Sequence, residues 1–561
     1  MKLEDIVRKH VLKNAYVYGK ADRGAVTGKV IAEFPDAKKD MKKTMAVINK
    51  IIGEVNTFSK AKIEKEMKNY EYVEKKEKKK ELELPNAIKG KVVTRFPPEP
   101  SGYPHIGHAK AAWLDYAAAE TYGGKMFLRF DDTNPEKESE EYVNAIKNGL
   151  NWLGIKWEKE TYTSDNMQEI YDYLERLLNA EKAYVCTCSQ ENISEGRMKG
   201  KACDCRGLPK KETLGRWKGM LEGKYGQGEA IVRYMGDLES QNTVMKDPTL
   251  ARIMVAEHFR QGKDYRVWPS YDFAVAVMDH LEGITHPMRS KEYELRNELY
   301  YSLFSDLGFE KPELVEFSRL AIKNAPISKR LITPLVKEGK VSGWDDPRLP
   351  TLEGLRRRGV LPEAIKNFVL SLGLSKSESE PGWELLLAEN RKLLDPTAKH
   401  YFFVRGAVLL MVKGLKKKIK LKMHPKKDLG SREVSVSGKV YISWDDAENL
   451  KKGEVFRLKD LCNVRLTEKE GKEFEGEVVK DSMVPKKIQW VPDNNKILCT
   501  VLVPHDLLKN GKYNPESLEE AKGYCEKDCE KLKEGEIIQF ERFGFCRFDK
   551  RGKELRFVFS C

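Results

Sequence analysis

The sequence predicts a protein of several domains, in which an α/β region is followed by a region made of strands. A chain of 561 residues is too long for one hydrophobic core, so three or four domains are expected. Residues 90–130 read as strand, loop, helix and strand, which is how an α/β unit with a parallel sheet begins. Beyond residue 396 the chain changes to short alternating segments separated by Gly, Asp and Lys, which predicts one or two β-barrels or sandwiches.

The first 85 or so residues predict helices, because apolar side chains recur there at spacings of three and four. This segment ends in a run that is rich in Lys and Glu, residues 61–84, and Pro85 and Asn86 close it. Such a run usually forms a solvated helix or a hinge, and we expect one of these here.

The α/β region is predicted from its apolar periodicity and its turn residues. Its expected elements are a strand at 90–96, a helix at 108–122, a strand at 125–130 and a helix from about 139 to 153. A compact insertion then interrupts the pattern. The later expected parts are this insertion around 183–268, the resumed α/β pattern at 271–286, and a helical stretch from 323 to about 395 with turns at 343–351 and 380–383.

The charge balance and the cysteine count limit the class of protein. There are 101 basic and 87 acidic side chains, which give a formal net charge of +14. This excess fits a well-solvated, lysine-rich surface, as in a thermophilic protein, or attraction to a polyanion such as nucleic acid. We expect a cytoplasmic protein with no membrane partner, because no run approaches a membrane-spanning length and the start lacks the apolar core of a signal peptide. Ten cysteines in so long a chain do not indicate a disulfide scaffold.

One stretch, RFPPEPSGYPHIGHAK (95–110), carries the first chemical signal. Its glycines and prolines let the backbone approach a ligand at the carboxyl end of a strand. The following helix directs its amino-terminal N–H groups at that ligand, which suits phosphate. His105 and His108 are three residues apart, so both can face the ligand from the first helical turn. From the residues alone, the alternative is that one histidine caps the helix and the other packs inside.

This stretch resembles the HIGH signature of the class I aminoacyl-tRNA synthetases, and in its full form the glutamyl/glutaminyl branch of that family. Further motifs follow in the family's order: RFDDTNP (129–135), LEGITH (281–286), FSRL (317–320), GWDDPRLPT (343–351), LRRRG (355–359) and GSREV (430–434). The resemblance covers roughly residues 90–561, and long motifs in this combination are very specific. It implies a Rossmann-like catalytic domain with an acceptor-stem insertion, a helical stem-contact domain and C-terminal anticodon-binding β-barrels.

The resemblance implies activation of an amino acid by ATP with Mg²⁺, and transfer of the acyl group to the terminal adenosine of tRNA. Since the α-phosphorus accumulates negative charge, such an enzyme mainly needs positioned donors and cations. His105 and His108 would donate hydrogen bonds to phosphate oxygens rather than act as nucleophiles, and Gly107 would leave room for the nucleotide. The implied catalytic residues are His105, His108 and Lys329, and the implied ATP-binding residues are Pro98, Glu99, His105, Gly107, His108, Arg319, Leu320, Ser328 and Lys329.

The family's second signature is a mobile lysine loop with the pattern KMSKS, and residues 325–330 (APISKR) occupy its place. The pattern is reduced, because Pro326 and Ile327 stand where the family has Lys and Met. Lys329 is therefore the one lysine left for the β- and γ-phosphates. Arg330 could supply the missing charge, although arginine mimics a point charge less well.

The resemblance places Arg95 against a substrate carboxylate, Asp131 against the α-ammonium group, and Tyr271 on the wall of the same pocket. Arg289 lies where glutaminyl enzymes carry a small neutral residue, so it would bind the γ-carboxylate of glutamate through a bidentate pair. The other interpretation of Arg289 is a solvated helix residue. Asn134 is common in the glutaminyl branch as well, but an arginine in the pocket touches substrate charge directly. Glutamate is therefore the predicted substrate.

Two pairs of cysteines in the insertion indicate a metal site. Cys186, Cys188, Cys203 and Cys205 form two C-x-C pairs, and four thiolates suit tetrahedral Zn²⁺. The spacing is tighter than the common C-x₂-C, and free thiols are the alternative. Some glutamyl-tRNA synthetases carry zinc in their acceptor-stem domain, so a structural Zn²⁺ is expected here. Two further cysteines are predicted to be packing residues on a helix, namely Cys525 and Cys529.

The strand-rich end resembles the anticodon-binding β-barrels of glutaminyl enzymes and of archaeal and eukaryotic glutamyl enzymes. Eight lysines within residues 413–427 could contact phosphates, although an exposed strand face would also be rich in lysine. The aromatic residues of 540–548 could stack on anticodon bases, but in a β-barrel they more often belong to the core. The helical segment ahead of residue 90 resembles archaeal versions and could position tRNA or a partner.

The resemblance as a whole is to the archaeal type of glutamyl-tRNA synthetase. It implies ATP-dependent formation of glutamyl-adenylate from L-glutamate and transfer to tRNA(Glu), with tRNA(Gln) as a second tRNA to consider, and we expect a monomer. The nearest alternative is a glutaminyl enzyme, followed by a relative that modifies tRNA bases and by a non-catalytic tRNA-binding descendant. The expected domains are a helical appendage at 1–88, the catalytic domain at 89–182 and 269–322, the insertion at 183–268, the helical stem-contact domain at 323–395 and the β-barrels at 396–561.

Overall fold

The computed structural model describes residues 3–67, 69–70, 82–378, 380–480 and 482–561. The chain divides into two compact units, residues 1–79 and 80–561. Each unit is described by itself. The centre of the Lys- and Glu-rich run, residues 71–81, lies outside the described residues, so the prediction of a helix or hinge there stays untested.

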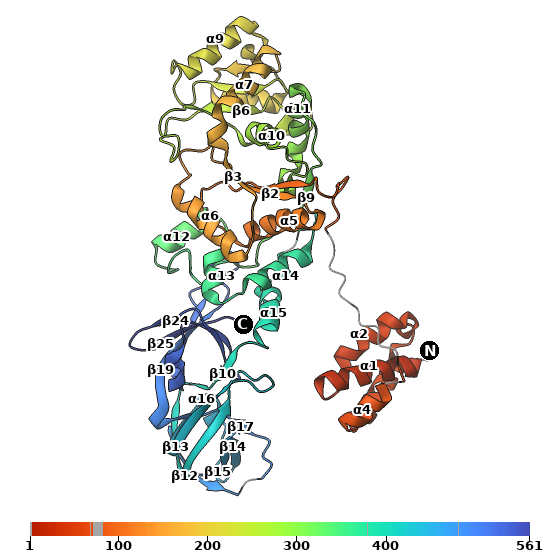
Figure 1. The fold of residues 1–561 in the computed structure, drawn as a ribbon, viewed down its shortest axis with the longest axis vertical. Coiled ribbons are helices and arrows are strands. Elements are labelled where there is room, and N and C mark those ends of the chain that lie inside the picture. The colour runs from red at the N-terminus through yellow and green to blue at the C-terminus, as the bar shows by residue number, and fades with distance from the viewer. Residues whose placement is uncertain (1–2, 68, 71–81, 379, 481) are drawn as a thin grey trace. The chain divides into compact units, whose positions relative to one another are not determined.

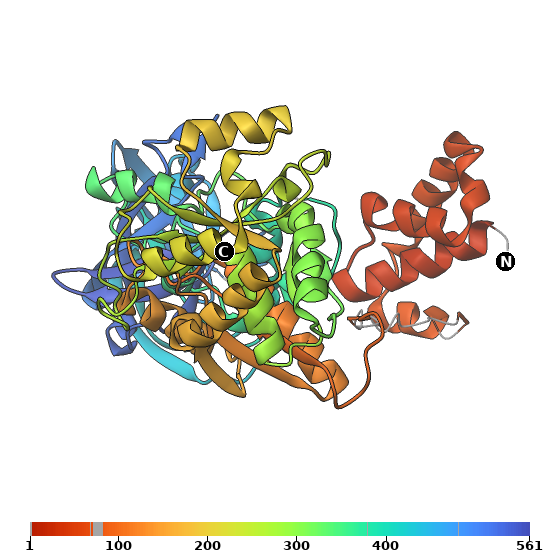
Figure 2. The ribbon, with the colours of Figure 1, turned by 90° about the horizontal axis from the view of Figure 1, so that it is seen from above.

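The described part of the first unit is a small helical bundle, as the apolar spacing predicts (Figures 1 and 2). Its longest helix packs against the three other α-helices, and apolar side chains such as Val11 and Ile48 are fully buried between them. Asp22 and Asp40 accept backbone hydrogen bonds as N-caps of the second and third helices, which fixes where these helices begin. The elements are α1 (Leu3–Tyr18), α2 (Arg23–Glu33), a 3₁₀ turn (Pro35–Lys38), α3 (Met41–Val55) and α4 (Lys60–Met67).

The second unit begins with a parallel sheet in the order β1-β2-β3, and this confirms the predicted α/β unit. Two more parallel strands, β8 and β9, lie beside β1, because Thr285 donates its backbone N–H to the carbonyl of Val93 in β1. Helix α5 contacts both β1 and β2. The elements are β1 (Val93–Phe96), α5 (Ile106–Tyr122), β2 (Lys125–Phe130), α6 (Glu140–Leu153), β3 (Lys159–Tyr162), β8 (Met288–Ser290) and β9 (Val315–Phe317).

The insertion forms a separate antiparallel sheet in the order β4-β5-β6-β7. Buried side chains of this sheet, among them Trp268, share one hydrophobic core with the helices that flank it in sequence. This continuous core joins the insertion to the α/β domain. The elements are α7 (Met167–Asn179), β4 (Ala183–Cys186), α8 (Gln190–Lys199), α9 (Lys210–Leu221), β5 (Ile231–Tyr234), β6 (Thr249–Ile253), β7 (Val267–Pro269), α10 (Tyr271–Leu281) and α11 (Asn297–Leu307).

A helical region follows the α/β domain, as predicted. Helix α14 packs on α5, and its buried side chains join the core of the catalytic sheet. Helix α13 contacts the C-terminal strands, so this region links the two sheet-containing parts of the second unit. The elements are α12 (Lys329–Lys337), α13 (Leu352–Arg358), α14 (Pro362–Leu372) and α15 (Trp383–Leu394).

The C-terminal region contains two mixed, curled sheets of seven strands, each with its own hydrophobic core. This confirms the predicted β-barrel region. One sheet has the order β17-β14-β15-β16-β12-β13-β18, with β12 (Val408–Lys422), β13 (Ser431–Ile442), β14 (Val455–Leu458), β15 (Cys462–Glu470), β16 (Glu473–Val479), β17 (Lys487–Ile488) and β18 (Val491–Pro492). The other has the order β10-β23-β24-β25-β19-β22-β11, with β10 (Lys399–Tyr401), β11 (Phe403–Arg405), β19 (Lys496–Pro504), β22 (Leu518–Glu526), β23 (Ile537–Phe540), β24 (Gly544–Arg551) and β25 (Leu555–Phe559).

Two sequence predictions about this region are decided by the structure. Cys525 lies in β22 and Cys529 in a short 3₁₀ turn, so the predicted helix is wrong, although both thiols are buried packing residues. The two cysteines are four residues apart, which is also a helical spacing, but here the first lies near the end of a strand and the second in the turn that follows it. Phe540, Phe545 and Phe548 are buried, so these three aromatic residues belong to the core. The eight lysines of residues 413–427 are all exposed, and their contact with tRNA stays a prediction.

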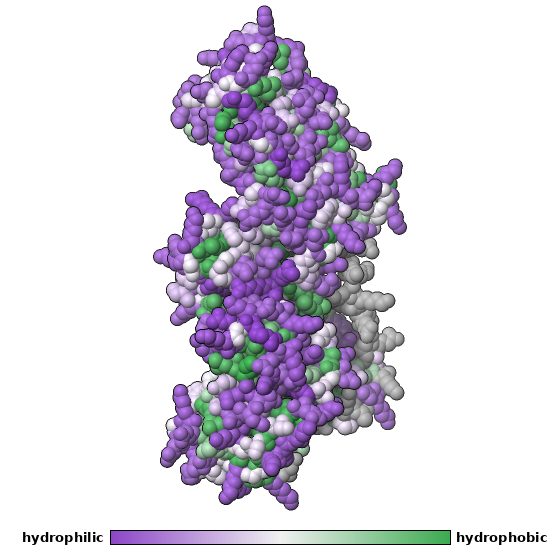
Figure 3. Space-filling model, turned by 60° about the vertical axis from the view of Figure 1, so that its left-hand side comes forward, coloured by the Kyte–Doolittle hydropathy of each residue, from purple (hydrophilic) through white to green (hydrophobic). Residues whose placement is uncertain are grey.

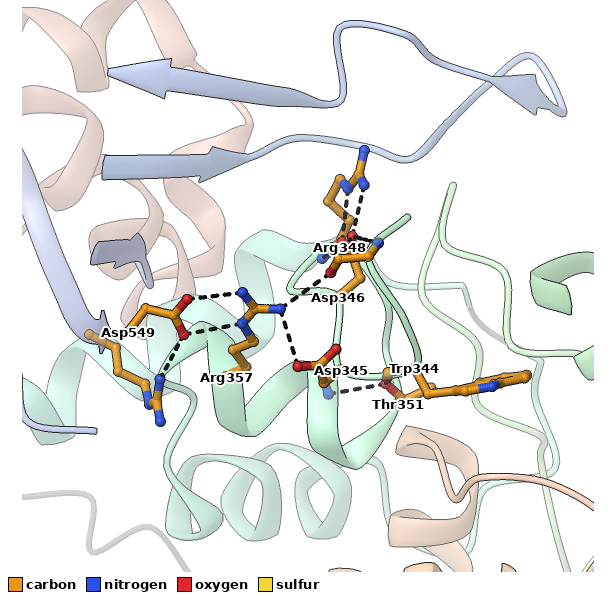
Figure 4. A network of polar contacts seen from close by, with 10 residues as sticks. Trp344, Asp345, Asp346, Arg348, Thr351, Arg357 and Asp549 are labelled. Carbon is orange, nitrogen blue, oxygen red and sulfur yellow. Dashed lines mark hydrogen bonds and ion pairs between the residues drawn. The ribbon is translucent and has the colours of Figure 1, made fainter. Parts of the chain in front are cut away.

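The helical region is tied to the C-terminal sheets by charged side chains (Figure 4). Arg357 of α13 forms two hydrogen bonds to Asp549 of β24, of 3.1 and 2.9 Å. Arg348 is buried, binds both oxygens of Asp346, and donates to the hydroxyl of Ser517 at 2.9 Å. Bidentate arginine pairs fix geometry as well as charge, so these contacts set the position of the helical region on the sheets.

The visible face of the molecule in Figure 3 is mostly hydrophilic, with small hydrophobic patches scattered between hydrophilic residues. This agrees with a composition in which 34% of residues are charged. Within the described ranges, no helix is both long enough and apolar enough to cross a membrane.

Candidate active site

A cavity of about 1270 Å³ lies at the carboxyl ends of β1, β2 and β8. Ligands of α/β sheets bind at this edge, where loops rather than side-by-side strands face the solvent. The cavity is lined by every residue that the sequence assigned to ATP or to the amino acid: Arg95, Pro98, Glu99, His105, Gly107, His108, Asp131, Tyr271, Arg289, Arg319, Leu320, Ser328 and Lys329. Arg95 and Lys329, which are 234 positions apart along the chain, thus line the same cavity.

His105 and His108 stand at the amino end of α5, with ring centroids 4.0 Å apart. The Nδ1 atom of His105 accepts the N–H of Gly107, and the Nδ1 atom of His108 accepts the N–H of His105. Both rings therefore cap the helix, and in the neutral form both carry their proton on Nε2. The capping interpretation and the ligand interpretation are compatible, because capping uses Nδ1 and leaves Nε2 as a donor.

Burial lowers the pKa of both histidines. The pKa of His108 falls to about 4, and burial together with the neighbouring His108 and Arg319 holds that of His105 well below its ordinary value. The two rings are neutral at pH 7. They can donate hydrogen bonds to an anion, but they bring no positive charge to it.

Gly107 is required by close packing. A Cβ atom at this position would stand 2.8 Å from Cε1 of His105 and 3.2 Å from the carbonyl oxygen of Leu320. A side chain at position 107 would therefore clash with the first histidine and with the FSRL segment. The sequence predicted a different reason for the glycine, namely that it makes room for a nucleotide. The prediction about the nucleotide remains untested.

The later part of the lysine loop, residues 327–330, lines the cavity. Ser328 is the N-cap of α12, and Lys329 is the first residue of that helix. The Nζ atom of Lys329 donates to the carbonyl of Ser101 at 2.9 Å and lies 4.4 Å from the ring centroid of Tyr142. Lys329 is exposed, whereas Pro326 is buried, so the loop offers its charge only from its second half.

The lysine loop is supported from the C-terminal sheet by a short hairpin of β20 (Leu508–Lys509) and β21 (Lys512–Tyr513). Asn324, just before the loop, donates from its side chain to Asp506 at 2.8 Å and accepts the N–H of Leu508 through its carbonyl at 3.0 Å. Leu507 is fully buried in a small core with Ile332 of α12. This support was not predicted, because it joins segments 182 residues apart.

Arg95 and Arg129 are buried in a paired network. Both guanidinium groups bind Asp279, with Nε of Arg95 at 3.0 Å and Nη2 of Arg129 at 2.9 Å from Oδ1. Arg95 also donates to the carbonyl of Met288, so three of its five N–H groups are already used by the protein. Burial alone would raise the pKa of Asp279, but the two arginines outweigh it and lower that pKa. The sequence contained one signal for Asp279, a carboxylate that directly follows the apolar run 273–278 of helix α10.

Asp131 follows β2 and presents one free oxygen. Its Oδ1 accepts from Nε of Arg129 at 3.0 Å and from the hydroxyl of Thr163 at 3.1 Å. Its Oδ2 is buried and has no hydrogen-bond partner among the residues that the structure describes. A buried carboxylate oxygen without a partner is costly, so this atom is suited to a cationic ligand group in the cavity.

Arg289 of β8 brings a positive charge to the cavity, opposite in sign to the carboxylate of Asp131. Its side chain is only 5% exposed, and its Nη2 donates to the side-chain oxygen of Asn297 at 2.6 Å. Its Nε is buried and has no partner within the described ranges. Tyr300 lies beneath the guanidinium, 4.8 Å from ring centroid to Cζ. Tyr271 lines the same space, and burial raises its pKa to about 12, which keeps the phenol neutral.

The four cysteines of the insertion lie together. The sulfurs of Cys186 and Cys203 are 3.8 Å apart, those of Cys188 and Cys205 are 3.9 Å apart, and all four lie within 4.8 Å of one another. Four sulfurs held about 2.3 Å from a tetrahedral Zn²⁺ would be about 3.8 Å apart, so the arrangement fits that ion. Arg216 donates to the sulfur of Cys205 at 3.3 Å, which favours the thiolate form.

Comparison with known proteins agrees with this geometry. Residues 91–396 match the model of the catalytic domain of the class I tRNA synthetases (E and Q), and residues 398–484 and 487–549 match the two models of their anti-codon binding domain. Among curated proteins, the chain is 46% identical to a glutamate–tRNA ligase of Nitrosopumilus maritimus, with 98% of each chain covered. It is 42% identical to the enzyme of the same name from Cenarchaeum symbiosum over 96% of each chain, and 43% identical to that of Pyrococcus abyssi over 98% of each. The chain therefore belongs to the glutamyl and glutaminyl (E and Q) family of class I tRNA synthetases.

Proposed function

We propose that this protein is a glutamate–tRNA ligase, which activates L-glutamate with ATP and transfers it to the 3′-terminal adenosine of tRNA(Glu). The observation that carries the choice of amino acid is Arg289, which lines the cavity and whose buried Nε has no hydrogen-bond partner among the described residues. A carboxylate can accept from this cation, whereas the neutral amide of glutamine would leave the charge without a counterion. The names of the curated relatives support the same substrate.

The roles of the side chains follow from their chemistry. The free oxygen of Asp131 would bind the α-ammonium group, the remaining N–H groups of Arg95 would bind a carboxylate, and Arg289 would bind the γ-carboxylate. In activation, an oxygen of the α-carboxylate forms a bond to the α-phosphorus, and the bond from that phosphorus to pyrophosphate breaks. The Nε2–H groups of His105 and His108 would donate to the phosphate oxygens as charge builds up.

The nucleotide would span the cavity from the histidines to the lysine loop. Lys329 would leave the carbonyl of Ser101 for the β- and γ-phosphates, and Arg330 lines the same side of the cavity. ATP-binding roles for Pro98, Glu99 and Arg319 rest on their place in the wall of the cavity. ATP brings Mg²⁺, which neutralises part of the phosphate charge.

We also propose that the four cysteines hold one structural Zn²⁺, through Cys186, Cys188, Cys203 and Cys205. Elemental analysis of the purified protein should give about one zinc per chain, and Cys203→Ser should lose it. A cysteine-intact protein that is folded and free of metal would contradict this proposal.

The tRNA would extend from the cavity to the C-terminal sheets, where the exposed lysines of residues 413–427 would contact its phosphates. A monomer that acts in the cytoplasm, where charged tRNA is used, is expected. Whether tRNA(Gln) is a second substrate stays a prediction about anticodon contacts.

Charging tests the proposal. Purified tRNA(Glu) and tRNA(Gln) would each be incubated with ATP and with radiolabelled glutamate or glutamine, in parallel. We expect glutamate to be attached to tRNA(Glu) and glutamine to neither. Attachment of glutamine without attachment of glutamate would instead identify a glutaminyl enzyme.

A further inference from the structure

Arg289 has an anionic neighbour with which it does not pair. On the parallel strands β8 and β9, Arg289 stands in register with Glu316. Both side chains are buried, with 5% and 8% of the residue exposed. Buried opposite charges at such positions normally pair directly. Here the ion pairs of Glu316 are made with Lys376, and among the described residues Arg289 has no ion pair to a carboxylate.

Asn297, the first residue of α11, lies between the two charges. Its side-chain oxygen accepts from Nη2 of Arg289 at 2.6 Å, and its Nδ2 donates to Oε1 of Glu316 at 2.7 Å. The other oxygen of Glu316 accepts from Nζ of Lys376. An amide is neutral and offers an acceptor on one side and a donor on the other, so it satisfies both groups without joining them.

This arrangement leaves the Nε atom of Arg289 without a hydrogen-bond partner among the described residues. A carboxylate bound directly to Arg289 would occupy the same donors that a substrate carboxylate needs, and would cancel the charge that attracts it. With Asn297 between them, the charge of Glu316 is balanced by Lys376 instead. Arg289 lines the cavity, and its Nε then stays without a hydrogen-bond partner within the described part of the chain.

We propose that Asn297 is a positioning residue for substrate recognition, which fixes the guanidinium of Arg289 and keeps Glu316 away from it. This inference rests on the proposed function, in which Arg289 binds the γ-carboxylate of glutamate. Asn297 acts through Arg289, so its loss should weaken binding of the amino acid and leave the use of ATP unchanged.

The test is a double-mutant cycle, measured as charging of tRNA(Glu) at saturating ATP and tRNA. In Asn297→Ala, Arg289 and the Oε1 atom of Glu316 both lose their hydrogen bond to Asn297, so these two groups can pair with each other. The KM for glutamate should rise on the order of 30-fold, with kcat and the KM for ATP changed by less than about threefold. In Asn297→Ala combined with Glu316→Gln, the competing charge is gone, and the KM for glutamate should return to within about threefold of the original value.

Two further variants control the cycle. Asn297→Asp places a carboxylate directly on Arg289, and should raise the KM for glutamate more than Asn297→Ala does. Glu298→Gln changes the exposed neighbour in the same helical turn and should leave every constant unchanged. Thermal unfolding midpoints of all variants would confirm that the fold is retained.

An unchanged KM for glutamate in Asn297→Ala would overturn the inference, and so would a double variant that is no better than the single one. A different result bears on the proposed function. If the unsubstituted protein charges glutamine and not glutamate, the identity of the substrate is wrong whatever the variants do.

Discussion

The two ends of the cavity are built in different ways. The end that we propose binds the amino acid, here called the amino-acid end, is formed by Arg95, Asp131 and Arg289, and consists of charges that several partners hold in place. The end that we propose binds ATP, here called the nucleotide end, is formed by His105, His108 and Lys329, and consists of neutral rings and an exposed lysine. Selection of one amino acid requires fixed charges, because a wrong substrate must leave a buried group unpaired. The phosphates carry their own charge, and they need donors and cations that can reach them.

The largest expected effect is on stability at the amino-acid end. In Asp279→Ala, the buried guanidinium groups of Arg95 and Arg129 lose their shared counterion, which should lower the free energy of unfolding by about 3–5 kcal/mol. Urea unfolding measures this. Asp172→Ala, at an exposed carboxylate on α7, should change stability by less than about 0.5 kcal/mol. Equal stability of the two variants would show that the buried network does not hold this end.

At the nucleotide end, the expected effect is on rate. Lys329→Ala removes an exposed side chain, so unfolding should be unchanged, while the charging rate should fall about 100-fold because a donor to the phosphates is lost. Arg330→Ala, one residue further on, should lower the charging rate about tenfold. Full activity of Lys329→Ala would show that this lysine has no role in the reaction.

The sequence predicted which residues form each end of the cavity, but it did not predict which partners hold the charges of the amino-acid end in place. Every residue that the motifs assigned to a ligand lines the cavity, because motif residues follow strand ends closely in sequence. Asp279 could not be placed, since its bond to Arg95 joins residues 184 apart in the chain. Asn297 was missed because its effect depends on three side chains from different elements. The helix α5 begins at Ile106, two residues before the predicted start, because His105 caps it.

A third effect concerns pH at the nucleotide end. Burial lowers the pKa of His108 from 6.5 to about 4 in the folded protein. Between these pH values the unfolded chain binds a proton that the folded protein does not bind, so the free energy of unfolding should fall as the pH drops. Gln does not titrate, so His108→Gln should show a shallower fall over this range. Denaturant unfolding at a series of pH values measures the free energy of unfolding of the unsubstituted protein and of His108→Gln. Identical slopes against pH would contradict a lowered pKa of His108.

The smallest expected effect concerns the support of the lysine loop. The backbone of Asn324 has a φ of +60°, which glycine adopts freely. Asn324→Gly therefore keeps the backbone conformation but loses the bond to Asp506. The KM for ATP should rise about threefold, with the KM for glutamate unchanged. Lys509→Ala, at an exposed position in the same hairpin, serves as the control. A rise in the KM for glutamate alone would mean that the hairpin supports the other end of the cavity.

The most informative measurement is the ratio of kcat/KM for glutamate to kcat/KM for glutamine, in the unsubstituted protein and in Arg289→Met. Methionine keeps much of the apolar volume of the side chain and removes its charge and its donors. We expect the ratio to fall at least about 1000-fold, because the γ-carboxylate would then enter a buried pocket without a counterion. A ratio that stays high in Arg289→Met would show that glutamate is selected elsewhere and that the charge of the amino-acid end has another purpose.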